Sequence, residues 1–158
     1  MHTDNVAVAP TPSFIDYKSF VDNAVALGAR RSLELPVSCP TWRTLAELRT
    51  VSASGPRQSG KTTYIAEAAM AGDLVISYNN GCKDRLQSKL AMGVDHLTAH
   101  SVFGGHAQLP IIDVQPVVYN RIYIDDASWV YDAFGRRIVL SHLLRHVNVT
   151  KSWIIGIG

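Results

Sequence analysis

Residues that could bind a phosphate group lie together in one short stretch of the chain. Segment 55–62, GPRQSGKT, fits the pattern G-x-x-x-x-G-K-[ST] at every position. Gly55 and Gly60 let the backbone wrap with its N–H groups pointing inward at an anion, and a helix beginning near Lys61 would add its positive N-terminal dipole. Lys61 would reach the outer phosphates, and the Thr62 hydroxyl would hold Mg²⁺. The predicted nucleotide-binding residues are Gly55, Pro56, Arg57, Gln58, Ser59, Gly60, Lys61, Thr62 and Thr63.

Two acidic residues follow an apolar run in the second half of the chain. Residues 121–126 read RIYIDD, an expected strand that ends in Asp125 and Asp126. Ligands of open α/β sheets bind at the carboxyl edge of the strands. We therefore expect Asp125 to bind Mg²⁺ beside Thr62. Asp126, the second predicted catalytic residue with Lys61, would orient or deprotonate the attacking water. Taken alone, the acids could cap a helix and the glycine-rich loop could match by chance, but each motif favours the functional interpretation of the other.

Composition limits the class of protein. The chain has 158 residues, 47% of them hydrophobic and 18% charged, which is enough for one domain with a sizeable core. Its net charge is +2 and its basic residues are spread evenly, so no run of lysine and arginine indicates nucleic acid. Cys39 and Cys82 lie in no metal-binding pattern. With no signal peptide and no stretch long enough to cross a bilayer, we expect a cytoplasmic protein without a membrane partner.

The elements before the loop form an N-terminal segment, and we expect its helices to pack against the sheet to which the loop belongs. Residues 1–13, small, polar and proline-spaced, indicate a mobile arm. Segment 14–49 predicts two short helices. The first has apolar residues at helical spacing and is expected to stop at Gly28, and the second is capped by Thr41 and runs through Leu48.

Residues 50–158 alternate strand and helix patterns, which predicts an α/β fold with a mostly parallel central sheet and helices on both faces. Five short runs are the expected strands, and the segment before Pro116 is expected to be a long loop. The expected elements are a strand entering Gly55, a helix over 61–71 ending at Gly72, a strand over 73–78, a helix from Cys82 ending at Gly93, a strand over 96–98, a loop to Pro116, a strand over 117–125, helices over 129–134 and 136–147 interrupted at Gly135, and a strand over 152–158.

The order of these segments resembles the first ATP-binding domain of superfamily-one helicases, a three-layer RecA-like P-loop fold. GPRQSGKTT matches the phosphate loop of these helicases, LVISYNNGCKDRL their next motif, LTAHSVFGG their T-x-H-S-[LF] segment, IYIDDASWVYD their metal-binding segment and WIIGIG the strand before their sensor. The similarity covers 50–158, which we take as the NTPase core. It implies ATP or another nucleoside triphosphate with Mg²⁺, and contacts to single-stranded nucleic acid from Asn79, Asn80, His100 and Ser101.

Three departures from this family bear on activity. Asp126 replaces the glutamate of the family, and a carboxylate misplaced by about an ångström can cost about a hundredfold in rate. The sequence reaches Gly158 before the sensor Asp and Gln, and it contains no second RecA-like domain with its arginine finger. No glutamine precedes Gln58 to read adenine, so GTP stays open beside ATP. We therefore expect slow hydrolysis, or hydrolysis that depends on a protein partner supplying an arginine finger or a second domain.

A second function of a different class is consistent with the same departures. The chain could be a regulatory or interaction module of helicase-like fold that binds a protein partner with little or no catalysis, and a compact viral genome is one setting for such a reduced domain. A small nucleotide kinase is disfavoured, because it would need an arginine-rich lid. Trp129, Tyr131 and Phe134 either stack on bases or pack in the core beside the acids.

Overall fold

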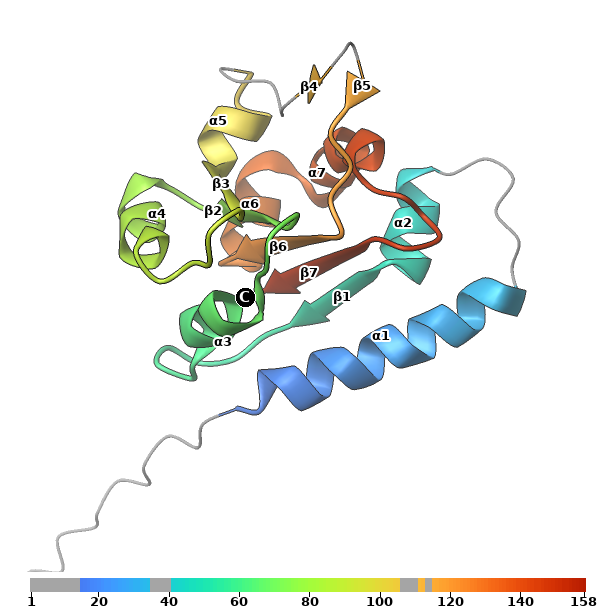
Figure 1. The fold of residues 1–158 in the computed structure, drawn as a ribbon, viewed down its shortest axis with the longest axis horizontal. Helices are drawn as coiled ribbons and strands as arrows, with labels where there is room; N and C mark the ends of the chain where they lie inside the picture. Colours follow the sequence, from blue (N-terminus) through green and yellow to red (C-terminus); the bar gives the residue numbers. More distant parts are fainter. Residues whose placement is uncertain (1–14, 35–40, 106–110, 113–114) are drawn as a thin grey trace, which may run out of the picture.

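A parallel β-sheet forms the centre of the computed structural model, which describes residues 15–34, 41–105, 111–112 and 115–158 (Figure 1). The sheet has five strands, all parallel. Their order across the sheet is β1 (Thr50–Ala53), β7 (Trp153–Ile157), β6 (Arg121–Asp125), β2 (Leu74–Ser77) and β3 (Asp95–Thr98). The predicted α/β fold with a parallel sheet is confirmed.

The central strands are apolar along their length because both faces of the sheet are covered. In β6, successive side chains alternate between the two hydrophobic clusters: Ile122 and Ile124 pack in one, and Tyr123 packs in the other. Ile154 and Ile155 of β7 divide in the same way. Such uninterrupted apolar runs are what made these strands predictable from sequence.

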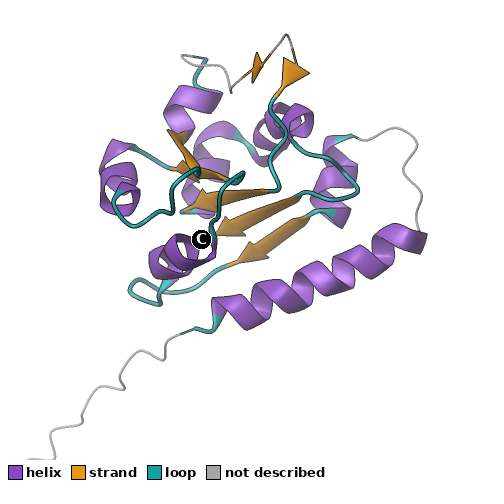
Figure 2. Ribbon diagram, in the orientation of Figure 1, coloured by secondary structure: helices purple, strands orange, loops and turns teal. Residues whose placement is uncertain are grey.

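Seven α-helices of the described residues cover the two faces of the sheet (Figure 2). One face carries α2 (Trp42–Leu48), α5 (Ala99–Phe103), α6 (Ala127–Phe134) and α7 (Arg136–Leu143). The other carries α1 (Tyr17–Glu34), α3 (Lys61–Ala68) and α4 (Asn80–Gln87). A 3₁₀ turn, η1 (Leu144–His146), follows α7, and β4 (Ile111–Ile112) pairs antiparallel with β5 (Gln115–Pro116).

The predicted stop of the first helix at Gly28 is wrong. Helix α1 continues to Glu34 and is 18 residues long, so it is not a short helix. An added Cβ at Gly28 would lie 2.5 Å from Cη2 of Trp153 and 3.2 Å from the Leu48 carbonyl oxygen. The glycine therefore allows α1 to approach β7 and α2 closely, and it does not mark a helix end. The second helix begins as predicted, since the Thr41 hydroxyl accepts the N–H of Thr44 at 3.3 Å.

Two further glycines lie in turns and not directly at the helix ends predicted for them. Helix α3 ends at Ala68 instead of residue 71, and α4 ends at Gln87, well before Gly93. The buried carboxylate of Asp73 accepts the N–H groups of Met70 at 2.9 Å and Arg121 at 3.1 Å. These bonds turn the chain into β2 before α3 could reach Gly72, which has a φ of 88°.

The segment predicted as one long loop contains regular structure. Helix α5 begins directly after β3, where the Thr98 hydroxyl accepts the N–H of Ser101 at 3.2 Å. It buries Val102 and Phe103 in the core. The predicted strand over 117–125 begins only at Arg121, and the last helix ends at Leu143 before η1. Helix α6 begins at Ala127, and Gly135 separates it from α7 as predicted.

Some sequence predictions lie outside the described residues, namely the arm over 1–13 and the state of Cys39. Cys82 is a buried free thiol. No helix in the described parts of the chain has the length and apolar character that crossing a bilayer requires.

The close approach at Gly28 gives a test of the fold. We expect Gly28→Ala to lower the free energy of unfolding by about 1–3 kcal/mol, because overpacking against the buried Trp153 ring outweighs the gain in helix propensity of about 1 kcal/mol. Chemical denaturation of both proteins measures the difference. Asn23→Ala, exposed on the same helix, is the control and should be neutral or slightly stabilising. A stabilised Gly28→Ala variant would contradict the packing at this position.

Candidate functional site

The strand register brings the two sequence motifs to one edge of the sheet. Ala53 at the end of β1 and Asp125 at the end of β6 both pair with Ile157 of β7. Neighbouring strands lie about 4.8 Å apart, so the chain leaves β1 and β6 at points separated by about two strand spacings. Residues 55–62, called the 55–62 loop below, follow the first point, and Asp126 follows the second.

The backbone of the 55–62 loop is held in an unusual conformation. Gln58 and Gly60 have positive φ values of 62° and 91°, and the N–H of Gly55 donates to the Gly158 carbonyl at 2.8 Å. Left-handed residues in such a turn aim successive N–H groups to one side, the arrangement that binds anions. Helix α3 begins at Lys61, at the end of this loop. Pro56, Arg57 and Gln58 are exposed, whereas Ser59 is buried.

Lys61 and Asp126, the two residues predicted to be catalytic, are brought together. Lys61 Nζ lies 4.0 Å from Asp126 Oδ1 and donates to the Gly55 carbonyl at 3.3 Å. The lysine side chain therefore spans from the start of the 55–62 loop to the acid that follows β6. Asp126 itself has a φ of 54° and precedes the first residue of α6. Non-glycine residues in this region are uncommon and cluster at functional sites.

Asp125 is a buried carboxylate with too little positive charge around it. Burial, and then the neighbouring charge of Asp126, raise the pKa of Asp125 to about 6, against weaker opposing effects of Lys61 and Arg85. A buried anion of this kind is a favourable ligand for a cation. The oxygen of a carboxylate is also the donor that Mg²⁺ prefers.

The donors around Asp125 fit a Mg²⁺ ion carried by a phosphate ligand. Thr62 lies half-buried in the first turn of α3, and no hydrogen bond within the described residues joins its hydroxyl to Asp125. In the same part of the chain, no group of three His, Cys, Asp or Glu residues could hold a metal unaided. Mg²⁺ commonly takes one or two protein oxygens together with substrate phosphates and water. Asp125 and Thr62 suit that kind of coordination.

Sequence reasoning missed the residues on the far side of Asp126. Cys82 Sγ, in the first turn of α4, lies 3.8 Å from Asp126 Oδ2 and 3.3 Å from Nη2 of Arg85. The guanidinium of Arg85 is also fixed by its Nε, which donates to the Gly81 carbonyl at 3.0 Å. The two carboxylate oxygens of Asp126 thus face different groups, a lysine and a thiol. No sequence pattern links Cys82 or Arg85 to the acids, because their proximity depends on how β2 and β6 pair.

A second contact missed from sequence involves the start of α1. The hydroxyls of Tyr17 and Ser59 are 2.6 Å apart and buried, and the N–H of Ile15 donates to the Ser59 carbonyl at 3.4 Å. The N-terminal helix therefore touches the 55–62 loop directly. Sequence analysis placed that helix in the N-terminal segment 14–49, which was expected to pack against the sheet, but it predicted no contact with this loop.

The four residues suggested for nucleic-acid contact divide into two pairs. Asn79 accepts the N–H of Cys82 at 3.0 Å, and the Ser101 hydroxyl donates to the Thr98 carbonyl at 2.8 Å, so both side chains take part in helix starts. Asn80 and His100 are exposed. Their contact with nucleic acid stays a prediction.

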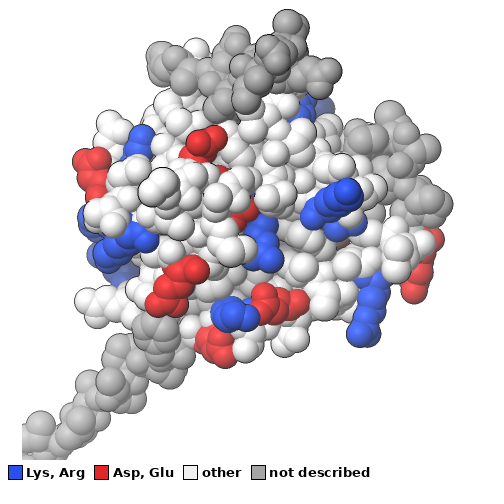
Figure 3. All heavy atoms as spheres, viewed as in Figure 1, with Lys and Arg blue, Asp and Glu red and all other residues white. Residues whose placement is uncertain are grey.

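His100 belongs to a row of aromatic side chains near the same edge. Its ring lies 5.5 Å from that of Tyr78 and 5.2 Å from that of Phe134. Tyr78 in turn lies 5.7 Å from Trp129, whose side chain is 48% exposed. Phe134 and Tyr131 pack against the core, whereas Trp129, like His100, is exposed to a ligand. On the face shown in Figure 3, basic and acidic side chains are intermixed and form no concentrated basic area.

The raised pKa of Asp125 predicts a pH dependence of stability. The folded protein holds the carboxyl proton of Asp125 more tightly than the unfolded chain, in which its pKa is 3.8. Ionisation of Asp125 therefore lowers the free energy of unfolding as the pH rises from about 4 through about 6. We expect Asp125→Asn, in metal-free buffer, to be more stable than the wild type by about 2–3 kcal/mol above pH 6, with the difference vanishing towards pH 4. Thermal denaturation across this range measures it.

Asp132→Asn, which removes an exposed carboxylate from α6, controls for the loss of one negative charge. A difference between wild type and Asp125→Asn that does not change with pH would contradict the buried, proton-retaining state of Asp125.

Comparison with known proteins assigns this chain to no family. No protein-family model matches it, and no curated protein matches it either. The chemistry of the site must therefore carry the functional assignment: a turn with left-handed residues, a lysine that reaches an acid at 4.0 Å, and a second acid that is buried and underneutralised.

Proposed function

We propose that the chain binds a nucleoside triphosphate with Mg²⁺ and hydrolyses it slowly or with the help of a partner. The single observation that supports this most is the pairing of Lys61 with Asp126, at 4.0 Å, where the 55–62 loop and β6 end side by side. ATP is the nucleotide favoured by the resemblance to helicases, with GTP open. In this proposal the α/β fold is a RecA-like P-loop domain.

The 55–62 loop and the start of α3 would bind the phosphates. Backbone N–H groups around Gln58 and Gly60 would donate hydrogen bonds to the inner phosphates, and the positive end of the α3 dipole would stabilise the same negative charge. Lys61 would leave Asp126 for the outer phosphates, since a phosphate carries more negative charge than one carboxylate. Asp125 and the Thr62 hydroxyl would hold Mg²⁺, which neutralises charge on the outer phosphate oxygens during transfer.

Asp126 would act on the attacking water. The water oxygen bonds to the terminal phosphorus as the bond to the bridging oxygen breaks, the nucleoside diphosphate leaves, and the proton of the water passes to Asp126. Departure of Lys61 towards the phosphates would free Asp126 Oδ1 for this role, while the Cys82 thiol, itself contacted by Arg85, stays on Oδ2. An aspartate reaches less far than a glutamate, which is the reason we expect slow turnover.

Partners follow from what such a site needs for fast turnover. A protein that supplies an arginine finger or a second domain would stabilise the charge of the transferring phosphate. Single-stranded nucleic acid is a further candidate partner, with Asn80, His100 and Trp129 as the exposed groups near the site.

A role as an interaction module is the second candidate. Phe20 and Leu27, seven residues apart and thus on one face of α1, are 49% and 52% exposed. A solvent-facing apolar pair on a long surface helix favours contact with a protein. This candidate requires no catalysis.

Replacement of Lys61 tests nucleotide binding. We expect Lys61→Ala to weaken binding of Mg²⁺–ATP at least about tenfold, because a lysine contact to phosphate is a charge-assisted interaction of about 1.5–3 kcal/mol. A titration monitored by calorimetry measures the affinity, and Lys89→Ala, which removes an exposed lysine beyond α4, is the control. Unchanged affinity of Lys61→Ala for Mg²⁺–ATP would contradict the proposed phosphate-binding site.

Replacement of Asp126 separates hydrolysis from binding. We expect Asp126→Asn to lower the rate of phosphate release by about 10²–10⁴-fold, the usual effect of a general base, with affinity for nucleotide retained. Asp126→Glu should keep or raise the rate. The assay is run with ATP and GTP, with and without single-stranded DNA or RNA, and stimulation by a strand supports the helicase-like function. Wild-type release no faster than that of Asp126→Asn under all conditions would favour the interaction module.

A further inference from the structure

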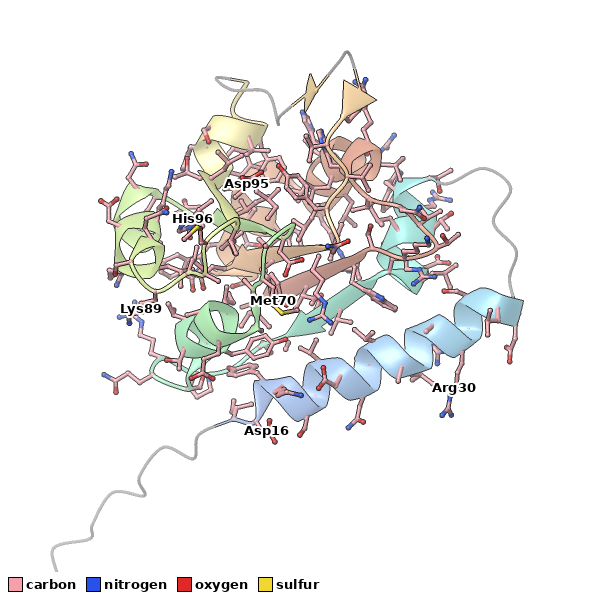
Figure 4. The ribbon with its side chains drawn as sticks, in the orientation of Figure 1. Asp16, Arg30, Met70, Lys89, Asp95 and His96 are labelled. Carbon is pink, nitrogen blue, oxygen red and sulfur yellow. The ribbon has the colours of Figure 1, made fainter. Side chains whose placement is uncertain are left out.

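The first turn of α1 lies against the 55–62 loop, and the two residues that join them, Tyr17 and Ser59, are 42 residues apart in sequence. Figure 1 shows the amino-terminal end of α1 beside the loop that leads into α3, and Figure 4 places Asp16 at that end. The Asp16 carboxylate accepts the N–H of Ser19 at 3.0 Å and its hydroxyl at 2.7 Å, which fixes where the helix begins. Tyr17 is thereby held in a defined position over the loop.

Tyr17 and Ser59 depend on each other for hydrogen bonding. Their side-chain oxygens are 2.6 Å apart, and the residues are only 2% and 1% exposed. Water is therefore not available to replace either partner. A buried hydroxyl that loses its partner is costly, so each side chain holds the other in place.

The start of α1 also touches the other end of the loop. An added Cβ at Gly55 would overlap the Tyr17 hydroxyl oxygen and lie 2.7 Å from Ile15 Cδ1. Gly55 has no positive φ, so the close approach of α1 explains the glycine here. Both Gly55 and Ser59 are thus in contact with residues 15–17.

Aromatic packing extends the contact of α1 into the core. The ring of Tyr17 lies 6.0 Å from that of Tyr64 on α3, which lies 6.3 Å from that of Tyr123 on β6. Helix α3 begins at Lys61, and β6 ends at Asp125. The N-terminal helix therefore packs on α3, which carries the lysine, and is connected through Tyr64 to β6, which carries the predicted metal-binding acid.

We propose that α1 braces the 55–62 loop through Tyr17, a positioning residue, so that docking of α1 and binding of nucleotide are thermodynamically coupled. This inference rests on the proposed function. Ser59 lies between Gln58 and Gly60, whose left-handed conformations aim the backbone N–H groups of the loop. A shift of Ser59 misaligns these groups. Coupling is reciprocal, so bound nucleotide must in turn stabilise the docked helix.

Affinity measurements on three variants test the coupling. Tyr17→Phe and Ser59→Ala each remove one hydroxyl, and we expect each to weaken binding of Mg²⁺–ATP by about 5- to 30-fold, within the usual range for coupled sites. The double variant should bind nucleotide no more weakly than the single variant with the larger effect, since both substitutions remove the same hydrogen bond. The matched control is Tyr119→Phe. Tyr119 is also a buried residue, and its hydroxyl donates to Asp95 at 2.7 Å. Tyr119 precedes β6 and therefore lies at the edge of the sheet opposite to the 55–62 loop.

Tyr119→Phe should also remove a hydrogen bond of the fold while changing affinity less than about twofold, because sites distant from the loop act independently. Affinities of Tyr17→Phe and Tyr119→Phe that agree within about twofold would overturn the coupling but not the proposed nucleotide site. Absence of nucleotide binding by the wild-type protein would overturn the coupling together with the proposed function.

Amide hydrogen exchange of α1 provides the reciprocal test. We expect Mg²⁺–ATP to slow exchange along α1 in the wild type and in Tyr119→Phe, and to slow it less in Tyr17→Phe. Without nucleotide, α1 should exchange faster in Tyr17→Phe than in the wild type. Equal exchange of α1 with and without saturating nucleotide in the wild type would overturn the coupling.

Discussion

The position of β7 between β1 and β6 is the constraint on which the rest of the structure depends. Through it, Ala53 and Asp125 both align with Ile157, and the 55–62 loop and Asp126 emerge from one edge of the sheet. The strand is buried on both faces, with residues of both hydrophobic clusters contributed by β7. A substitution that displaced β7 would separate Lys61 from Asp125 and Asp126 without contacting any of the three.

The site at this edge concentrates features that are unfavourable in an ordinary fold. Asp125 is a buried anion, and Gln58 and Asp126 hold left-handed backbone conformations. Lys61 lies between the loop and Asp126 and offsets part of the negative charge. Such groups persist when the surrounding structure holds them, and in the described residues they gather where a phosphate and a cation would bind. Their common location is the physical basis for the proposed triphosphate site.

The N-terminal helix belongs physically to this site. At one end Tyr17 is joined to the 55–62 loop, and further along Gly28 lets the helix approach Trp153 of β7. The same helix thus contacts both the loop and the strand that aligns the two motifs. Its outer face keeps Phe20 and Leu27 exposed, which leaves a surface through which a protein could act on the helix. In the proposed coupling, binding of a protein to this surface would change nucleotide affinity through Tyr17.

The sequence alone determined the local features: the 55–62 motif, the apolar strands, the Thr41 cap and the acids after β6, because each depends on residues close together in the chain. Tertiary structure decided where helices end. The long-range hydrogen bond from the Arg121 N–H helps Asp73 to turn the chain after α3, and the helix α1 continues past Gly28 because the glycine packs closely against Trp153. Tertiary structure also decided which distant residues join the site, among them Tyr17 and Cys82. These depend on strand order and on the path of α1, and a pattern of neighbouring residues carries no information about either.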